Sequence, residues 1–364
     1  MNKTSDSLSQ LALRKFKKNF WGVLSFWLIV SIGLMSLFAY VIAPDDSKNA
    51  NQMHLSIHSQ RPGFEVQMLC IPSEIKNNQN IFSSVLFGNE NSDLEIPISK
   101  YFIENTKLVY TEYASDGLIG ASKSIELSVF PSPDYKPYVK QKTFLFGTDK
   151  YGRDLLSRIL IGSRISFSIG FIAVFISLII GVFMGSVAGY YGGKVDAIIM
   201  WIINVTWSIP TLLLVIAITL ALGKGFWQVF IAVGLTMWVE VARVVRGQII
   251  SAKEMQYVTA ARALGFNDYR IITKHILPNI MAPIIVISAA NFAGAILIES
   301  GLSFLGIGAQ PPMASWGAMI KDHYNYIILG KPYLAMIPGL CIMVLVMAFM
   351  LIGNALRDAL DVKS

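Results

Sequence analysis

Six apolar runs, each at least about 20 residues long, constrain this chain more than any other feature of its sequence. A helical run of that length matches the hydrocarbon thickness of a bilayer. The composition agrees, since 54% of the residues are apolar and only 15% are charged, which lies outside the usual range of soluble domains. The runs cover residues 20–42, 165–190, 197–222, 226–245, 280–305 and 333–354. The sequence therefore predicts an all-α polytopic membrane protein with six transmembrane helices.

Basic residues before the first run predict how the chain is oriented. Arg14, Lys15, Lys17 and Lys18 precede it, and positive charge tends to stay on the cytoplasmic side. We therefore expect a cytoplasmic segment at residues 1–19 and, after six spans, a C-terminus on the same side. The net charge of +7 is then explained by orientation and not by nucleic-acid binding. Because the first run is longer than a typical signal-peptide core, we expect a retained anchor.

The long segment between the first two runs predicts a small domain outside the membrane. We place this extracytoplasmic insertion domain at residues 43–143 and the membrane core, with the other five helices, at residues 144–364. Alternating apolar and polar side chains predict strands at 64–70 and 124–130. The stretch 73–93 is rich in Asn and Ser and predicts a loop. Three prolines are expected to close the domain: Pro131, Pro133 and Pro137.

A polar, basic island at residues 257–279 interrupts the apolar sequence. It combines small residues for a smooth helix face, a glycine for the end of a first helix, capping residues for a second helix and a proline for the next run's first turn. These residues are Ala260, Ala261, Ala263, Gly265, Asn267, Asp268 and Pro278. The pattern predicts a knob at the membrane surface that another protein can grip.

Two carboxylates lie inside apolar runs, where a charge is costly and usually functional. Glu240 lies one turn before Arg243 on the same helix face, which predicts a structural ion pair. Glu299 lies among small residues that allow close packing or a kink. We expect it to have a structural or gating role at an outer pore mouth, with direct substrate contact as the alternative. The pore or outer-gate candidates are Asn291, Glu299, Ser300 and Ser303.

The sequence lacks the motifs of enzymatic chemistry. There is no P-loop, and its nearest approach, at residues 223–225, follows no strand, so we expect no ATP hydrolysis by this chain. His54 and His58 have ligand-like spacing only if they lie on a helix, which the region does not predict, so no metal site is expected. Cys70 and Cys341 lie far apart in the predicted topology and imply no disulfide framework.

Six ordered segments within residues 144–364 carry a resemblance to one family. They are FGTDKYGRDLLSRILIGSRISF (146–167), GYYGGKVD (189–196), ARVVRGQ (242–248), YVTAARALGFNDYRIITKHILPN (257–279), ESGLSFLGIGAQPPMASWGAMI (299–320) and LRDALD (356–361). On these segments the chain resembles the permease subunits of bacterial dipeptide, oligopeptide and nickel importers of the ATP-binding-cassette class. The signature residues are Gly147, Thr148, Asp149, Gly152, Arg153, Asp154, Arg246 and Gly247.

The resemblance implies that residues 252–277 form a cytoplasmic coupling helix that docks on an ATPase subunit. The residues that match this motif are Ala260, Ala261, Gly265, Leu277 and Pro278, and Thr259 is expected to act with them as a coupling residue. Two of its positions depart from the family: Thr259 stands where the motif begins with Glu, and His275 replaces an Ile before the proline. Trp201 and Asn204 stand where many relatives carry Arg and Asp.

The resemblance also implies the partners, the location and the function. The partners would be a second homologous permease, two ATPase subunits that bind ATP and Mg, and an extracytoplasmic solute-binding protein, in a bacterial inner membrane. The chain itself would hold no cofactor, no metal and no catalytic residue. We expect it to form the translocation pathway for peptides, with nickel or another small solute as the alternative cargo. A rival from another class is a secondary transporter or channel without ATPases, and a further rival is a sensor or scaffold subunit built on the insertion domain.

Overall fold

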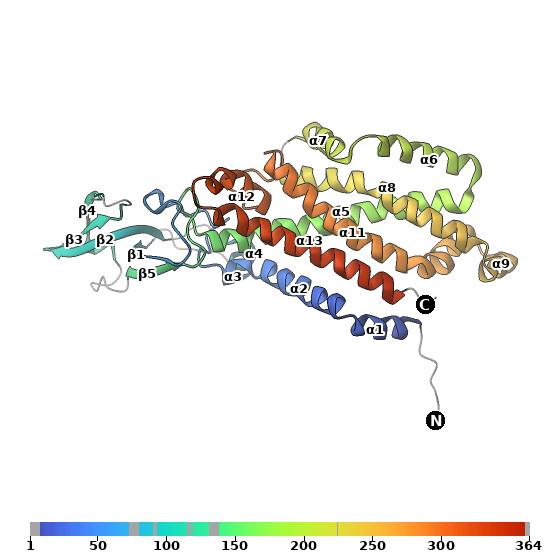
Figure 1. Ribbon diagram of the computed structural model, residues 1–364, viewed down its shortest axis with the longest axis horizontal. Helices are drawn as coiled ribbons and strands as arrows, with labels where there is room; N and C mark the ends of the chain where they lie inside the picture. Colours follow the sequence, from blue (N-terminus) through green and yellow to red (C-terminus); the bar gives the residue numbers. More distant parts are fainter. Residues whose placement is uncertain are drawn as a thin grey trace, which may run out of the picture. The chain divides into compact units, whose positions relative to one another are not determined.

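The computed structural model describes residues 8–72, 80–89, 93–114, 118, 120–130, 138–223 and 225–360 (Figure 1). These residues fall into two compact units, which we treat separately. The helical unit contains the described residues of 8–32, 166–308 and 341–360, and the sheet unit contains those of 33–165 and 309–340. Some helices contribute residues to both units.

The described part of the chain is mostly helical, as the sequence predicts. The longer helices are α1 (Leu8–Lys18), α2 (Phe20–Leu37), α5 (Leu155–Tyr191), α6 (Gly193–Ser208), α7 (Thr211–Leu222), α8 (Phe226–Lys253), α11 (Met281–Phe304) and α13 (Tyr333–Leu360). The shorter ones are α3 (Ala39–Ile42), α4 (Ile81–Phe87), α9 (Gln256–Ala263), α10 (Asp268–Arg270) and α12 (Trp316–His323). Five single-turn or irregular segments complete the set: η1 (Leu55–Ile57), η2 (Leu127–Val129), η4 (Ile271–Ile276), η5 (Leu277–Ile280) and η6 (Tyr324–Ile327).

Among the described residues, five helical segments are long and apolar enough to cross a membrane, and a bent helix pair brings the number to as many as six. The predicted span at 197–222 contains two helices and not one, because α6 and α7 meet at an angle of 93°. Pro210 explains the break. It has no backbone N–H to continue a helix, and it forces Ile209 before it into an extended conformation, with φ −90° and ψ 128°.

Helix α5 is much longer than the predicted run at 165–190. It covers 37 residues and begins at Leu155, because the polar side chains of its first turns are buried within the sheet unit instead of ending the helix. Small residues then bring α5 against α8 inside the helical unit. Side chains added at Gly181, Gly185 or Gly189 would overlap with atoms of α8. This four-residue glycine spacing is the small-residue stripe that membrane helices use for close contact.

The sheet unit contains five antiparallel strands in the order β4-β3-β2-β1-β5. Their bounds are β1 (Phe64–Ile71), β2 (Leu94–Glu104), β3 (Lys107–Glu112), β4 (Ser122–Glu126) and β5 (Val139–Phe144). The central strand β1 buries side chains on both faces. Met68 packs with Ile57 and Phe144 on one side, and Leu69 packs with Ile98 on the other.

The structure confirms one predicted strand of this unit and corrects two other expectations. The run 64–70 is β1, but the run 124–130 is a strand only as far as Glu126 and then turns into η2. The predicted loop 73–93 contains the helix α4, which begins after Asn80. The residues Pro131, Pro133 and Pro137, together with 73–79 and 90–92 of the predicted loop, lie outside the described residues.

Candidate functional site

The island at residues 257–279 folds as a helix, a corner and a second helical segment, as predicted. We call residues 256–280 the knob. Helix α9 follows α8 after a single break and lies at the end of α8 in Figure 1. The corner is built on Gly265, whose φ of +76° is in the left-handed region that glycine adopts without steric cost. Asn267 caps the second segment, because its Oδ1 accepts a hydrogen bond of 2.9 Å from the backbone N–H of Arg270.

The second half of the knob runs directly into a membrane helix. Helix α10 continues as the π-helical segment η4 (Ile271–Ile276), then as η5 and α11, so that 268–304 form one helical run. Pro278 lies in the first turn of η5, where its missing N–H costs nothing. This half of the knob and α11 are therefore parts of one helical run.

The first half of the knob is fixed to the same helices by a shared apolar core. Val258, Ala261, Ile271 and Ile276 are each less than 5% exposed. They pack with buried residues of α5, α8 and α11 in a single cluster. Burying several such side chains contributes about 1.5 to 3 kcal/mol for each large one, so the knob is a firm extension of the helices and not a loose loop.

One polar contact ties the knob to α5, and a second joins α8 to α6. The hydroxyl of Tyr190, at the end of α5, donates a 2.7 Å hydrogen bond to Asp268 Oδ1. The guanidinium of Arg246, a signature residue on α8, binds Asp196 of α6 through two hydrogen bonds of 2.5 and 2.6 Å. Gly247, the neighbouring signature residue, has open space where a side chain would lie.

The predicted coupling residues divide into a surface group and a supporting group. Thr259, Ala260, Gly265 and Pro278 are exposed, whereas Ala261 is buried and Leu277 packs against the core of the knob. Sequence reasoning missed the two most exposed large hydrophobic side chains of the knob. Leu264 is 72% exposed and Tyr269 is 76% exposed. The available signal was that these apolar residues stand inside an otherwise polar island, one on each side of the glycine corner.

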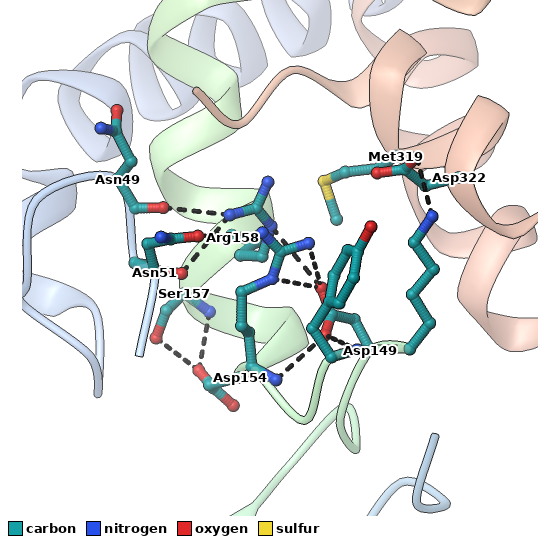
Figure 2. A network of polar contacts seen from close by, with 12 residues as sticks. Asn49, Asn51, Asp149, Asp154, Ser157, Arg158, Met319 and Asp322 are labelled. Atoms are coloured by element: carbon teal, nitrogen blue, oxygen red, sulfur yellow. Dashed lines mark hydrogen bonds and ion pairs between the residues drawn. The ribbon is translucent and has the colours of Figure 1, made fainter. Parts of the chain in front are cut away.

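The other signature residues form a buried polar network in the sheet unit (Figure 2). Asp149 is fully buried and binds the guanidinium of Arg153, with Nε and Nη2 each 2.6 Å from Oδ2. Its Oδ1 accepts from the backbone N–H groups of Tyr151 and Arg153 at 2.8 and 3.0 Å. Arg153 also donates to Asn51, and Arg158 donates to the carbonyl of Asn49. The carboxylate of Asp149 therefore organises its own loop.

Glycines and hydroxyl groups hold this loop against the segment before β1. Gly147 and Gly152 have φ of +77° and +73°, and a side chain at either position would overlap with the backbone of residues 54–61. Thr148 receives a 2.9 Å hydrogen bond from the N–H of Gln60 and donates to the carbonyl of Ile57 at 2.5 Å. The signature is therefore explained structurally, as a motif that locks the beginning of α5 to the chain that leads into the sheet.

Three titratable groups around the network have shifted pKa values. Burial raises the pKa of Asp154, although hydrogen bonds from Ser157 oppose the shift. Burial lowers the pKa of Lys150, but its 3.0 Å hydrogen bond to Asp322 and their charge attraction outweigh burial and raise it overall. Burial lowers the pKa of His323. The N–H of Lys150 donates to His323 Nε2 and His323 Nδ1 lies 2.7 Å from the Met319 carbonyl, which fits a neutral imidazole.

The four pore or outer-gate candidates all lie on α11 and are buried. Ser303 Oγ donates a 2.7 Å hydrogen bond to Glu299 Oε1, and Ser300 Oγ lies 3.5 Å from Oε2. Asn291, two turns earlier, lines a cavity that does not include the other three. The structure thus brings Glu299, Ser300 and Ser303 together and separates Asn291 from them.

The predicted ion pair between Glu240 and Arg243 does not form in the described part of the chain. Arg243 instead lies over the ring of Trp207, with its Cζ 3.8 Å from the ring centre. The face of an indole attracts a guanidinium, and helix spacing alone gave no sign of this partner on α6. Among the described residues, no group of three or more side chains is arranged to hold a metal. Lys224, in the motif that comes nearest to a P-loop, lies outside the described residues.

Comparison with known proteins identifies the family. A family model described as binding-protein-dependent transport system inner membrane component matches residues 178–363. A second model, the N-terminal TM domain of oligopeptide transport permease C, matches residues 7–62. The chain belongs to the family of binding-protein-dependent inner-membrane permeases, and the resemblance to importers of the ATP-binding-cassette class is confirmed.

Similar individual proteins agree with this assignment. The chain is 44% identical over 218 residues to the dipeptide transport system permease protein DppC of Bacillus subtilis. The aligned residues cover 60% of this chain and 68% of that protein. The chain is 38% identical over 252 residues to the oligopeptide transport system permease protein OppC of the same organism, covering 69% and 77%. Among solved structures, the MetNI methionine ABC transporter aligns with 56% of this chain and 95% of its own, at 17% identity and a TM-score of 0.47.

Proposed function

We propose that this permease forms part of the translocation pathway for peptides in an importer driven by two partner ATPase subunits. The named relatives that it resembles over most of its membrane core transport dipeptides or oligopeptides. A second permease completes the pathway, and an extracytoplasmic binding protein delivers the cargo. In this arrangement the α6–α7 pair counts as one span, which gives six spans, an inner-membrane location and both termini in the cytoplasm.

The observation that carries the mechanism is the construction of the knob. Its core is shared with α5, α8 and α11, and its second half is continuous with α11. We propose that the knob is the coupling helix and docks on the ATPase through its exposed corner, where Leu264 and Tyr269 flank Gly265. When the ATPases close, a rigid knob transmits the movement to these helices and opens the pathway to the other side of the membrane.

This mechanism assigns no enzymatic step to the permease. ATP and Mg are bound and ATP is hydrolysed by the partner subunits, and the chain contributes the pathway and the coupling. Thr259 replaces an acidic residue at the start of the coupling motif, so this permease docks without a charge contact at that position.

A reconstituted complex tests the proposal. The permease, its partner permease and the ATPases are purified together and placed in proteoliposomes with binding protein. We expect ATP hydrolysis to rise when the binding protein carries di-alanine or tri-alanine and to stay at its basal level with Ni²⁺. Stimulation by Ni²⁺ alone would assign the alternative cargo, and transport without the ATPases would contradict the class of mechanism.

The sheet unit is proposed to help seat the binding protein outside the membrane. The structure shows how to remove the sheet without damaging the polar network. The N–H of Gly63 donates to the carbonyls of Phe144 and Leu145 at 2.9 and 3.2 Å, so joining residue 63 to residue 145 bridges neighbouring backbones. A cut that begins at residue 48 would instead remove Asn49 and Asn51, which bind Arg158 and Arg153.

The expected result of excising residues 64–144 is weaker binding of the binding protein with intact membrane insertion. Unchanged affinity, measured by surface plasmon resonance on the assembled complex, would contradict the seating role. Intact uptake together with loss of a regulatory response would favour the hypothesis that the chain is a sensor subunit.

A further inference from the structure

A cavity of about 320 Å³ lies within the helical unit, where α6 and α7 bend apart beside α8 and α11. That volume is at the lower end of the range of small-molecule sites. Its polar lining comes from the side chains of Thr206, Thr211, Thr236, Glu240 and Asn291. The remaining lining is apolar and includes the indole of Trp207. A few polar groups in an apolar wall are the usual composition of a site for a small organic ligand.

The amide of Asn291 has an unused donor in this cavity. Asn291 is only 1% exposed, and its Nδ2 has no hydrogen-bond partner among the described residues. A buried amide donor without an acceptor costs free energy comparable to a lost hydrogen bond. A ligand that carries a carbonyl group satisfies this donor.

Two of the cavity's hydroxyl groups and its carboxylate can only accept hydrogen bonds from a ligand. The hydroxyls of Thr206 and Thr236 donate to carbonyls of their own helices at 2.9 Å each, so only their oxygen lone pairs remain for a ligand. Glu240 contributes an exposed side chain. The nearest cation on its helix, Arg243, lies over Trp207, and among the described residues it forms no ion pair with Glu240. The lining thus combines a carboxylate and hydroxyl groups with the unsatisfied amide donor of Asn291.

The carboxylate of Glu240 favours a ligand with a positively charged group. The break between α6 and α7 adds to this preference. Helix α6 ends at Ser208 after Thr206 and Trp207, which both line the cavity. The last carbonyls of a helix carry partial negative charge and favour cations. In transporters, helix breaks at membrane depth expose such backbone ends to substrates, because irregular backbone there is tolerated where it lines a cavity.

We propose that this cavity binds the amino-terminal end of the transported peptide. The α-ammonium group lies between the Glu240 carboxylate and the end of α6, the first peptide carbonyl accepts from Asn291 Nδ2, and the first side chain packs on the apolar wall. The proposal rests on the proposed function, since it takes the cargo to be a peptide. It adds that this permease recognises the free amino terminus itself, independently of the binding protein.

Direct binding to the assembled complex without binding protein tests the proposal. The probe is tritiated di-alanine or tri-alanine, measured by a scintillation proximity assay on the complex in nanodiscs. We expect saturable binding, and we expect N-acetyl-di-alanine to compete roughly tenfold or more weakly, because acetylation removes the charge that Glu240 binds. No saturable binding, or equal competition by the acetylated peptide, would overturn the proposal without depending on any variant.

Matched variants test the two named side chains. Glu240→Gln and Asn291→Leu are expected to weaken peptide binding roughly tenfold or more and to raise the KM of uptake while the binding protein keeps its own peptide affinity. Glu104→Gln is the control for peptide binding, because this exposed carboxylate lies on β2 of the sheet unit and outside the cavity. Wild-type binding and KM in both cavity variants would refute the site. Failure of the wild-type complex to move any peptide would refute the proposed function instead.

Discussion

Replacing Gly265 by alanine tests the backbone conformation of the knob's corner without changing how the knob packs. The residue has φ of +76°, and no atom lies within 4 Å of the position that a Cβ would take. Alanine therefore meets no steric obstacle from neighbouring residues. The whole effect of the substitution comes from holding an L-residue in the left-handed region, which costs about 1 to 2 kcal/mol.

The corner has a specific way to relieve that cost, and this determines the expected phenotype. Two backbone hydrogen bonds close the corner, from Gly265 N–H to Arg262 O at 2.9 Å and from Phe266 N–H to Ala261 O at 3.2 Å. Rotating residue 265 out of the left-handed region breaks this arrangement and moves Leu264 and Tyr269 relative to each other. Since 1 to 2 kcal/mol corresponds to roughly 5- to 30-fold in an equilibrium, we expect Gly265→Ala to lower ATP-driven uptake by about that factor.

The matched control is Gly265→Asn, which adds a larger side chain but tolerates the left-handed conformation better than alanine does. We expect the asparagine variant to transport much closer to the wild-type rate. The assay is ATP-driven peptide uptake into proteoliposomes at equal amounts of assembled complex, with membrane insertion checked separately. Wild-type uptake by the alanine variant, or equal loss in both variants, would refute the conformational argument.

Three further predictions concern stability and use the unfolding midpoint of the purified protein in detergent. Gly170→Ala should destabilise by about 1 to 3 kcal/mol, because the new methyl group overlaps with the ring of Phe292. Asp149→Asn should cost about 3 to 5 kcal/mol, because it leaves the guanidinium of buried Arg153 without its carboxylate. Acidification should destabilise the sheet unit through His323, whose pKa is lowered by burial from 6.5, so stability is lost as the pH falls below about that value.

Each of these predictions has a control in the same chain. Gly247→Ala adds the same methyl group to a helix where nothing lies within 4 Å, and it should be neutral or slightly stabilising. Glu112→Gln breaks an exposed ion pair with Lys123 and should leave the midpoint nearly unchanged. The His323→Asn variant should lose the pH-dependent component. An equal loss for Gly170→Ala and Gly247→Ala, a neutral Asp149→Asn, or an unchanged pH profile in His323→Asn would each contradict its prediction.

Local patterns were predictable where one physical requirement acts within a few residues. Strand β1 follows from its alternating side chains, and the corner at Gly265 follows from the demand for a left-handed residue after a helix. The cap at Asn267 is likewise a short-range hydrogen bond. These requirements involve neighbours in sequence, so the pattern contains the information.

The errors occurred where a distant contact overrode the local pattern. The 93° bend between α6 and α7 is the exception, because it follows from Pro210 within the run itself. Glu240 and Arg243 have the spacing of an ion pair, but the guanidinium of Arg243 instead lies over the ring of Trp207 on α6. The predicted run begins only at residue 165, although α5 begins at Leu155, because the polar side chains of its first turns are buried.

The sequence by itself determined that this is a membrane permease of a binding-protein-dependent importer, because apolar length and ordered signatures are properties of the linear chain. It also determined where the knob lies and how it turns. Only the tertiary structure decided which side chains work together. The knob shares one core with three helices, the signature carboxylate organises a buried network, and Asn291 and Glu240 line one cavity. These groupings depend on packing between residues far apart in sequence, and spacing along the chain does not encode such contacts.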